Sequence, residues 1–335
     1  MGFGSQSGQV MFGTQTAKGT PLVMSATVGV AMKLRSGSLA PNRELLVPDP
    51  EIGGGRDTSD AYLGTVSFGG DYEFYARLES ITTLLKACLG GASSATATGV
   101  NTHTITAVDT ALPWLSVQER ISNTLDAYDY LDAVVNTFHL EAEANGYLQG
   151  TAGLIAMRQT PQATPVAAPT WDNSPLLVGT NITVTYNAVT LPAKSFTFDV
   201  NNNFEDDDFR LGSFFLGDLT PKQREVTASV TVRHADSSLF RQATYGTPAA
   251  VAVGGVTTKQ QVVITATTYE DIPASTPLTK SSITITLPNV ILEPFAFEPS
   301  ADDVLESDIS MRAVRPVPGT PIVTVVVKNG KATIA

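Results

Sequence analysis

The 335-residue sequence contains a single cysteine, Cys88. One cysteine can form neither an internal disulfide nor a cysteine-based zinc site, and it fits a reducing cytoplasm. Charged residues are also scarce, at 16% against about 25% in an average soluble domain. A low charged share is typical of chains that bury surface between subunits, so we expect large contacts between copies.

Positive charge is in short supply as well. Lys and Arg number 21 against 32 Asp and Glu, which gives a net charge of -11 and a pI near 4.7. This balance excludes a protein that clamps nucleic acid through its phosphates.

Long apolar runs are missing too. The richest run, Pro321 to Val327, has the length of a strand rather than of a membrane helix. Met1 to Gln9 shows neither the basic nor the apolar region of a secretory signal. We therefore expect no membrane role and synthesis in the cytoplasm.

Residues for catalysis or metal binding are few and scattered. The histidines His103, His139 and His234 fall in separate predicted strands without a metal-binding spacing. Cys88 lies on the apolar stripe of a predicted helix, which indicates a buried, inert thiol. Gly53-Gly54-Gly55-Arg56 lacks the rest of a phosphate-binding motif and predicts a loop tip. We expect no enzyme activity, no cofactor and no metal.

An acidic run from Asp199 to Asp208 offers alternate oxygen ligands of the kind that wrap calcium. Phe204 stands where a calcium loop needs glycine, and Arg210 stands where it needs glutamate. We interpret the run as a solvated acidic loop and keep a cation at a subunit contact as the alternative.

The sequence is rich in short β-type runs bounded by Gly, Pro, Asn or Asp, which predicts an all-β fold with few helices. The clearest predicted strands are Asp71 to Leu78, Thr102 to Ala107, Val134 to Ala142, Asn181 to Tyr186, Ser195 to Val200, Glu225 to His234, Gln261 to Thr268, Ser282 to Leu287 and Ile322 to Lys328.

Two short helices are predicted, Ser80 to Leu89 and Asp236 to Tyr245, each after a strand and each followed by glycine. Their predicted caps are 156 residues apart, and so are the glycines that follow them, Gly90 and Gly246. Met157 and Met311, in similar strand ends, are separated by 154 residues. These offsets predict a tandem duplication.

The duplication and the Pro-rich segment between the halves predict a domain organisation. It comprises an N-terminal arm at 1–40, a first domain at 41–160, a linker at 161–175, a second domain at 176–316 and a C-terminal hairpin at 317–335. Asn329-Gly330 predicts the turn of that hairpin. We expect the N-terminal arm to reach a neighbouring subunit or ring.

Two long polar loops occupy corresponding places, Pro48 to Gly64 and Asn201 to Pro221. The second also carries an apolar cluster, and such a cluster would favour aggregation if exposed in a monomer. We interpret it as an intersubunit contact, with a cap on the second domain's core as the alternative. The cluster comprises Phe209, Leu211, Phe214, Phe215 and Leu216.

Several segments resemble siphophage major tail tube proteins that contain two fused tail-tube domains. They are the acidic loop, strand and helix from Glu51 to Gly91, the opening Phe12 to Thr20, and Gly146-Tyr-Leu-Gln-Gly150 before the strand that ends at Met157. The resemblance implies tandem β-sandwich domains, each with a flanking helix, whose sheets form a multi-subunit β-barrel around a lumen. It covers most of the chain.

The resemblance further implies a virion tail subunit that stacks as rings around the channel for DNA ejection. Two fused domains imply a trimer with pseudo-sixfold symmetry, with a hexamer as the alternative. The implied partners are other copies, the tape measure protein and DNA in the lumen, and the tail terminator and distal tail proteins at the ends. The implied ring-to-ring contact residues are Asp49, Glu51, Arg56, Tyr62, Phe209, Leu211, Phe214, Phe215 and Leu216.

Two other classes fit the strand pattern. A self-assembling surface-layer or fibre protein has a similar composition, although the N-terminus lacks an export signal. A β-sandwich carbohydrate-active enzyme would present aromatic side chains along a cleft, whereas Trp114 and Trp171 are the only tryptophans. Glycan binding or turnover would favour the enzyme.

Overall fold

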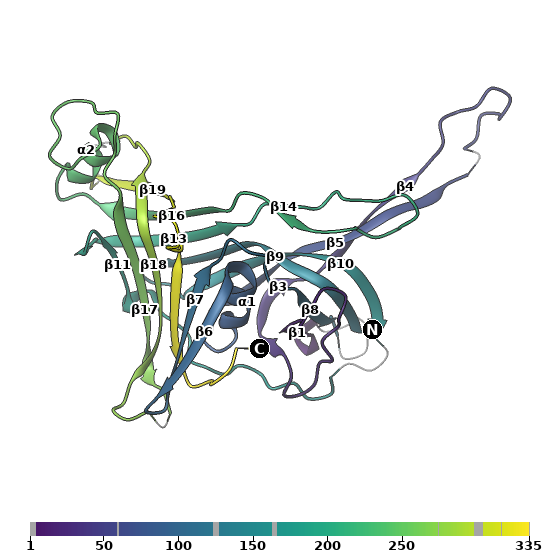
Figure 1. Cartoon of the computed structure of the whole chain (residues 1–335), viewed down its shortest axis with the longest axis horizontal. Helices are drawn as coiled ribbons and strands as arrows, with labels where there is room; N and C mark the ends of the chain where they lie inside the picture. The colour runs from purple at the N-terminus through teal and green to yellow at the C-terminus, as the bar shows by residue number, and fades with distance from the viewer. Residues whose placement is uncertain are drawn as a thin grey trace.

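The computed structural model describes residues 5–58, 60–122, 127–162, 166–273, 275–297, 304–315 and 317–334. Its strands form two layers with the hydrophobic core between them, and one hairpin projects far from the body (Figure 1). The prediction of an all-β chain with short helices is confirmed.

Layer 1 is an antiparallel sheet that runs through both halves of the sequence. Its order is β4 or β3, then β5, β10, β9, β13, β16 and β19. The bounds are β3 (Leu34–Gly37), β4 (Ala40–Leu46), β5 (Tyr62–Tyr75), β9 (Ala127–Glu143), β10 (Gln149–Gln162), β13 (Ala193–Asn201), β16 (Glu225–Arg233) and β19 (Glu306–Ala313).

Layer 2 also joins the two halves. Its order is β6, β7, β20, β18, β17, β11 and β12. The bounds are β6 (Gly90–Ala97), β7 (Val100–Ala107), β11 (Ile182–Tyr186), β12 (Val189–Thr190), β17 (Gln260–Asp271), β18 (Lys280–Leu292) and β20 (Thr324–Asn329).

The order of elements repeats in the two halves. In each, a strand pair leads into a helix, a hairpin of layer 2 follows, and a final strand returns to pair with the strand before the helix. These are β4, β5, α1 (Ile81–Leu89), β6, β7 and β10 in the first half, and β13, β16, α2 (Ser238–Tyr245), β17, β18 and β19 in the second. The order agrees with the offsets, while the duplication stays a prediction.

The two helices differ in their surroundings. Helix α1 lies between the layers, and all its residues except Lys86 are buried. Helix α2 lies at the margin, where only Gln242 is buried. The N-cap of α1 is Ser80, as predicted, and the N-cap of α2 is Ser237, one residue after the predicted Asp236. Neither N-cap residue makes a side-chain cap bond. Asp236 still caps α2 through its carboxylate, which accepts from the Ser238 amide at 2.8 Å.

Part of the N-terminal segment forms strands within the fold of its own chain, while its contact with a neighbouring subunit or ring stays a prediction. Strand β1 (Gln9–Thr14) pairs with β8 (Leu115–Arg120) and β2 (Val30–Met32), and β8 pairs with β9. Phe12 and Ala31 are fully buried. Burial of these apolar side chains stabilises the segment within layer 1.

The segment expected to be a linker is ordered at both ends. Strand β10 continues to Gln162, so Pro161 and Gln162 belong to a strand and not to the linker expected at 161–175. Asp172, near the other end, is buried and accepts from the Ser80 amide at 2.7 Å. Asp172 thus supplies a hydrogen bond at the start of α1.

The predicted C-terminal hairpin is wrong. β20 does not pair with the residues after Asn329-Gly330 but lies between β7 and β18, one strand from each half. Val323, Val325 and Val327 are fully buried there. The buried Asn329 side chain turns inward and donates to the Leu78 carbonyl at 2.7 Å. Pairing on two sides and burial of alternate valines outweigh the local turn preference.

The remaining short elements are β14 (Phe204–Glu205), which pairs with β15 (Thr220–Pro221), and the 3-10 turns Ser5–Ser7 and Gly179–Asn181. Buried residues from both halves form one contiguous core cluster. The halves are therefore joined by backbone pairing in both layers and by a shared core.

Candidate functional site

The solvent face of layer 1 is polar across six strands. Alternate residues point into the core, for example Phe138 and Phe198, so their neighbours share the opposite face. One cross-strand row on that face runs in register through Glu73, Thr151, His139, Asp199, Thr227 and Arg312.

Negative charge dominates this polar face. The arginines on this face are paired: Arg312 forms ion pairs with Glu225 and Glu293, and Arg233 pairs with Glu306, as does Lys194. Arg35 donates to Gln149 at the margin of the face. The other rows are filled mainly by Ser, Thr and Gln. The carboxylates on the face are Asp71, Glu73, Glu141, Glu143, Asp199, Glu225, Glu306 and Asp308.

His139 lies at the centre of the polar face, where the first half meets the second. Its Nδ1 is 2.6 Å from a carboxylate oxygen of Asp199 on β13, and its Nε2 is 3.5 Å from Glu141. The hydrogen bond to Asp199, more than the charges of the two carboxylates, raises the pKa of His139 above its ordinary value, against the opposing effect of burial. A protonated His139 thus ties β9 to β13.

The arm, residues 40–69, is the hairpin of β4, the first part of β5 and the connection between them. Its base at Val66 and Phe68 is buried, and beyond this base the hairpin projects from the rest of the chain (Figure 1). All seven residues of β4 are exposed. Apolar side chains on the arm are exposed as well, namely Leu45, Leu46, Val47, Ile52, Tyr62 and Leu63. An exposed apolar patch of this kind is typical of a protein contact.

Four predicted contact residues lie on the arm. Asp49, Glu51 and Arg56 are exposed in the connection, and Tyr62 is exposed at the start of β5. The Tyr62 hydroxyl donates to Asp60 at 2.6 Å, which lowers the pKa of Asp60. The structure therefore places these four side chains where a second molecule can reach them.

The other five predicted residues lie in the β14–β15 loop, residues 206–219, and they divide into two groups. Leu211 and Phe214 are exposed, at 107% and 61%, and Phe209 is partly exposed. Leu216 is buried with Leu112, Val134 and Met157, all of the first half, and Phe215 packs against the main core. The loop thus covers the core edge of the first half, not of the second as the alternative supposed.

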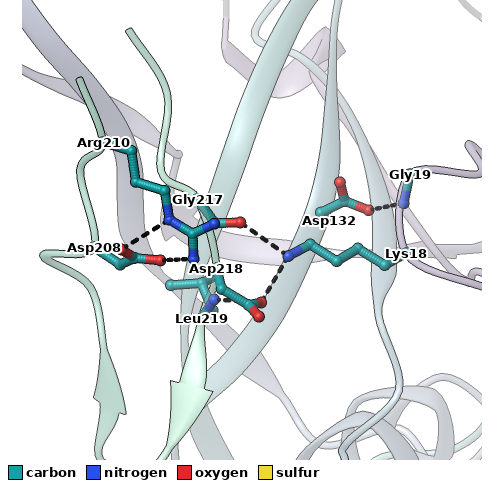
Figure 2. A network of polar contacts seen from close by, with 8 residues as sticks. All are labelled: Lys18, Gly19, Asp132, Asp208, Arg210, Gly217, Asp218 and Leu219. Carbon is teal, nitrogen blue, oxygen red and sulfur yellow. Dashed lines mark hydrogen bonds and ion pairs between the residues drawn. The ribbon is translucent and has the colours of Figure 1, made fainter. Parts of the chain in front are cut away.

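Polar contacts hold this loop in place (Figure 2). Lys18 Nζ is 2.6 Å from Asp218 and donates to the Gly217 carbonyl at 3.1 Å. Arg210 pairs with Asp208 at 2.7 Å within the loop. The Val66 amide on β5 donates to the Phe214 carbonyl at 2.8 Å. The β14–β15 loop is therefore docked at the start of β5, beside the base of the arm.

Sequence reasoning missed the polar sheet face and the apolar residues at the base of the arm. A signal for the face was present, since polar residues alternate with apolar ones along β9 and β13. For the arm, Leu45, Leu46 and Val47 were available in the sequence next to the polar loop. Within the described residues, no group of three or more potential ligands suits a metal ion, and no helix is long and apolar enough to cross a membrane.

A two-layer β-fold with a broad polar face and exposed apolar loops is typical of a structural assembly protein. The chain belongs to the phage tail tube protein family, whose family model matches residues 5–299. It is a structural subunit of a bacteriophage tail tube and a component of the virion tail. No curated protein sequence matches this chain.

Proposed function

We propose that copies of this chain close into rings with the polar face of layer 1 turned toward the central channel. The supporting observation is the face itself, on which carboxylates outnumber arginines and lysines. A negative channel wall repels the phosphate backbone, so DNA passes without binding. The tape measure protein would occupy the same channel before DNA does.

We further propose that a ring contains three chains with pseudo-sixfold symmetry. The repeated order of elements supports two similar units in each chain, one at 41–160 and one at 176–316. In a homo-oligomer with closed cyclic symmetry, every copy makes the same contacts. Three copies then present six similar units around the channel.

Contacts from one ring to the next fall on the outer side of the two loops. Leu211 and Phe214 are exposed although the β14–β15 loop is docked, and the arm adds Asp49, Glu51, Arg56 and Tyr62. Phe215 and Leu216 face their own chain, so we assign them to docking of the loop instead. Burial of the exposed apolar side chains would stabilise the stack.

The chain's role is structural and not catalytic in this proposal. It is made in the host cytoplasm, assembles with further copies, and meets the tail terminator at one end of the tube and distal tail proteins at the other. Membership of the tail tube family supports this role.

The double substitution Leu211→Ser with Phe214→Ser tests the ring-to-ring contact. We expect a folded subunit that forms rings but no long tubes, because apolar area is lost only from the outer side of the loop. Electron microscopy measures ring and tube formation, and the melting temperature reports folding. Val251→Ser with Val253→Ser, also at exposed positions, is the matched control. Tubes of ordinary length from the loop variant would contradict the proposed contact.

A further inference from the structure

A basic groove lies in the second half, at the start of β16 and the end of β19. Its volume is about 1100 Å³, and the segments after β7 and before β20 complete its walls. Four cationic side chains line it against two carboxylates, in a chain with a net charge of -11. The charged lining residues are Asp109, Lys222, Arg224, Glu225, Arg312 and Arg315.

The cations of the groove differ in their partners. Arg315 pairs with Asp109, and Arg312 pairs with Glu225. Arg224 is partly buried, and its hydrogen bonds go to the Asn202 side chain at 2.9 Å and the Val108 carbonyl at 3.0 Å. In the part of the chain that the structure describes, no carboxylate forms an ion pair with Arg224. Lys222 lies 3.7 Å from Glu205. Arg224 is therefore the one lining cation that no carboxylate of the described residues pairs with, although the lining itself holds more cations than carboxylates.

The corresponding place in the first half is occupied. It is the start of β5 with the end of β10, where the β14–β15 loop docks on Val66 and Leu216 packs against Met157. The offset of 156 residues relates Val66 to Lys222, and the offset of 154 residues relates Met157 to Met311. Lys222 lines the groove, and Met311 directly precedes Arg312, which also lines it. One chain thus fills the first of two corresponding places and leaves the second open.

The arm is the first-half counterpart of the loop that fills the first place. The β14–β15 loop lies in the connection between β13 and β16, which pair with each other. The arm's connection likewise joins β4 to β5, which also pair. The loop lies on its own chain, whereas the arm projects into solvent (Figure 1). The arm's connection, residues 47–61, carries Asp49, Glu51, Asp57 and Asp60 against Arg56. Its net negative charge is complementary to Arg224 and to a groove lining in which cations outnumber carboxylates.

We propose that the groove receives the arm of a second copy of this chain. The contact is head to tail: each copy gives its arm to one neighbour and accepts the arm of the other, which closes a ring when the rotation between copies closes. This inference rests on the proposed function and identifies the surface that joins neighbours within a ring. The outer side of the arm stays available for the next ring, as Leu211 and Phe214 do on the docked loop.

Charge reversal tests the contact. The groove variant Lys222→Glu with Arg315→Glu is expected to fold normally and to need at least about tenfold higher concentration to form rings, since like charges now face each other. Adding Asp57→Lys with Asp60→Lys to the same chain is expected to restore rings. The control Arg241→Glu with Lys259→Glu makes the same change in net charge at exposed positions outside the groove. Ring formation is measured by light scattering and electron microscopy.

Cysteine pairing is a second, independent test. A chain with Asp57→Cys and Gln223→Cys is expected to form covalent oligomers under mild oxidation, whereas Asp57→Cys with Lys259→Cys is expected to form none. The native thiol does not interfere, because burial raises the pKa of Cys88 to about 12.

The outcomes separate the two levels of the proposal. If the unaltered chain forms no rings, the proposed function fails. The groove inference alone is overturned by a different set of results. In that case the unaltered chain forms rings, the groove variant assembles at the same concentration, and Gln223→Cys gives no cross-linking.

Discussion

Asn202 is a single side chain that holds the two halves together. It is buried at the end of β13, and its amide donates to the Cys88 carbonyl at 3.0 Å and the Val135 carbonyl at 2.9 Å. Its carbonyl accepts from Arg224 at 2.9 Å. One residue of the second half thus satisfies polar groups on α1 and β9 of the first.

Asn202→Ala is expected to lower the free energy of unfolding by about 3 kcal/mol, because each buried polar group left without its partner costs about 1–3 kcal/mol. Chemical denaturation measures the change. Asn42→Ala, at an exposed position of β4, is the control and should change stability little. A loss below about 0.5 kcal/mol for Asn202→Ala would contradict this role.

At the scale of elements, the pairing of β9 with β13 joins the halves across layer 1, and His139 with Asp199 is its polar contact. The folded-state pKa of His139 is raised, so its contribution to stability is complete below the unfolded value near 6.5 and is lost as the pH rises through the higher folded value.

The pH dependence of this contact is measurable as a difference between two chains. The melting temperature of the unaltered chain should exceed that of His139→Gln most at pH 5.5 and least at pH 8.5. Other titrating groups, such as His234, whose pKa burial lowers, are present in both chains and cancel. A difference that stays constant over this range would count against the assignment.

Local patterns predicted most elements, because strands and helices depend on alternation, capping residues and glycine. Gly90 and Gly246 do follow their helices, with backbone φ of 95° in both. Pairing over long distances in the sequence was not predictable in this way. The pairing of β20 with β7 and β18 outweighs the turn preference of Asn329-Gly330. No local pattern in the N-terminal segment predicted that β1 would pair with β8.

The candidate site was predictable in part for the same reason. Both long loops were evident as polar insertions, and they carry the exposed side chains of the arm and of the β14–β15 loop. The division of that loop into a docked side and an exposed side depends on where the first half lies. That arrangement is tertiary, so no local pattern indicates it.

At the scale of the whole molecule, charge is distributed unevenly between the two layers and the groove. Glu73→Lys with Glu143→Lys, both exposed on the polar face, should leave assembly intact and make tubes retain DNA, because cations attract phosphate. Co-sedimentation of DNA with tubes measures retention, which should fall as salt is raised. Glu270→Lys with Asp271→Lys on β17 is the control, and equal retention by both variants would refute the orientation of layer 1.

Docking of the β14–β15 loop on β5 within one chain also affects the kinetics of assembly. A contact between segments of one polypeptide has a fixed effective concentration, so it forms as the chain folds and does not depend on how much protein the cell has made. In a ring of three chains, half of the six junctions would already exist before any two molecules meet. Within a ring, only the three junctions between arm and groove would then respond to dilution, and these would set the concentration at which rings close.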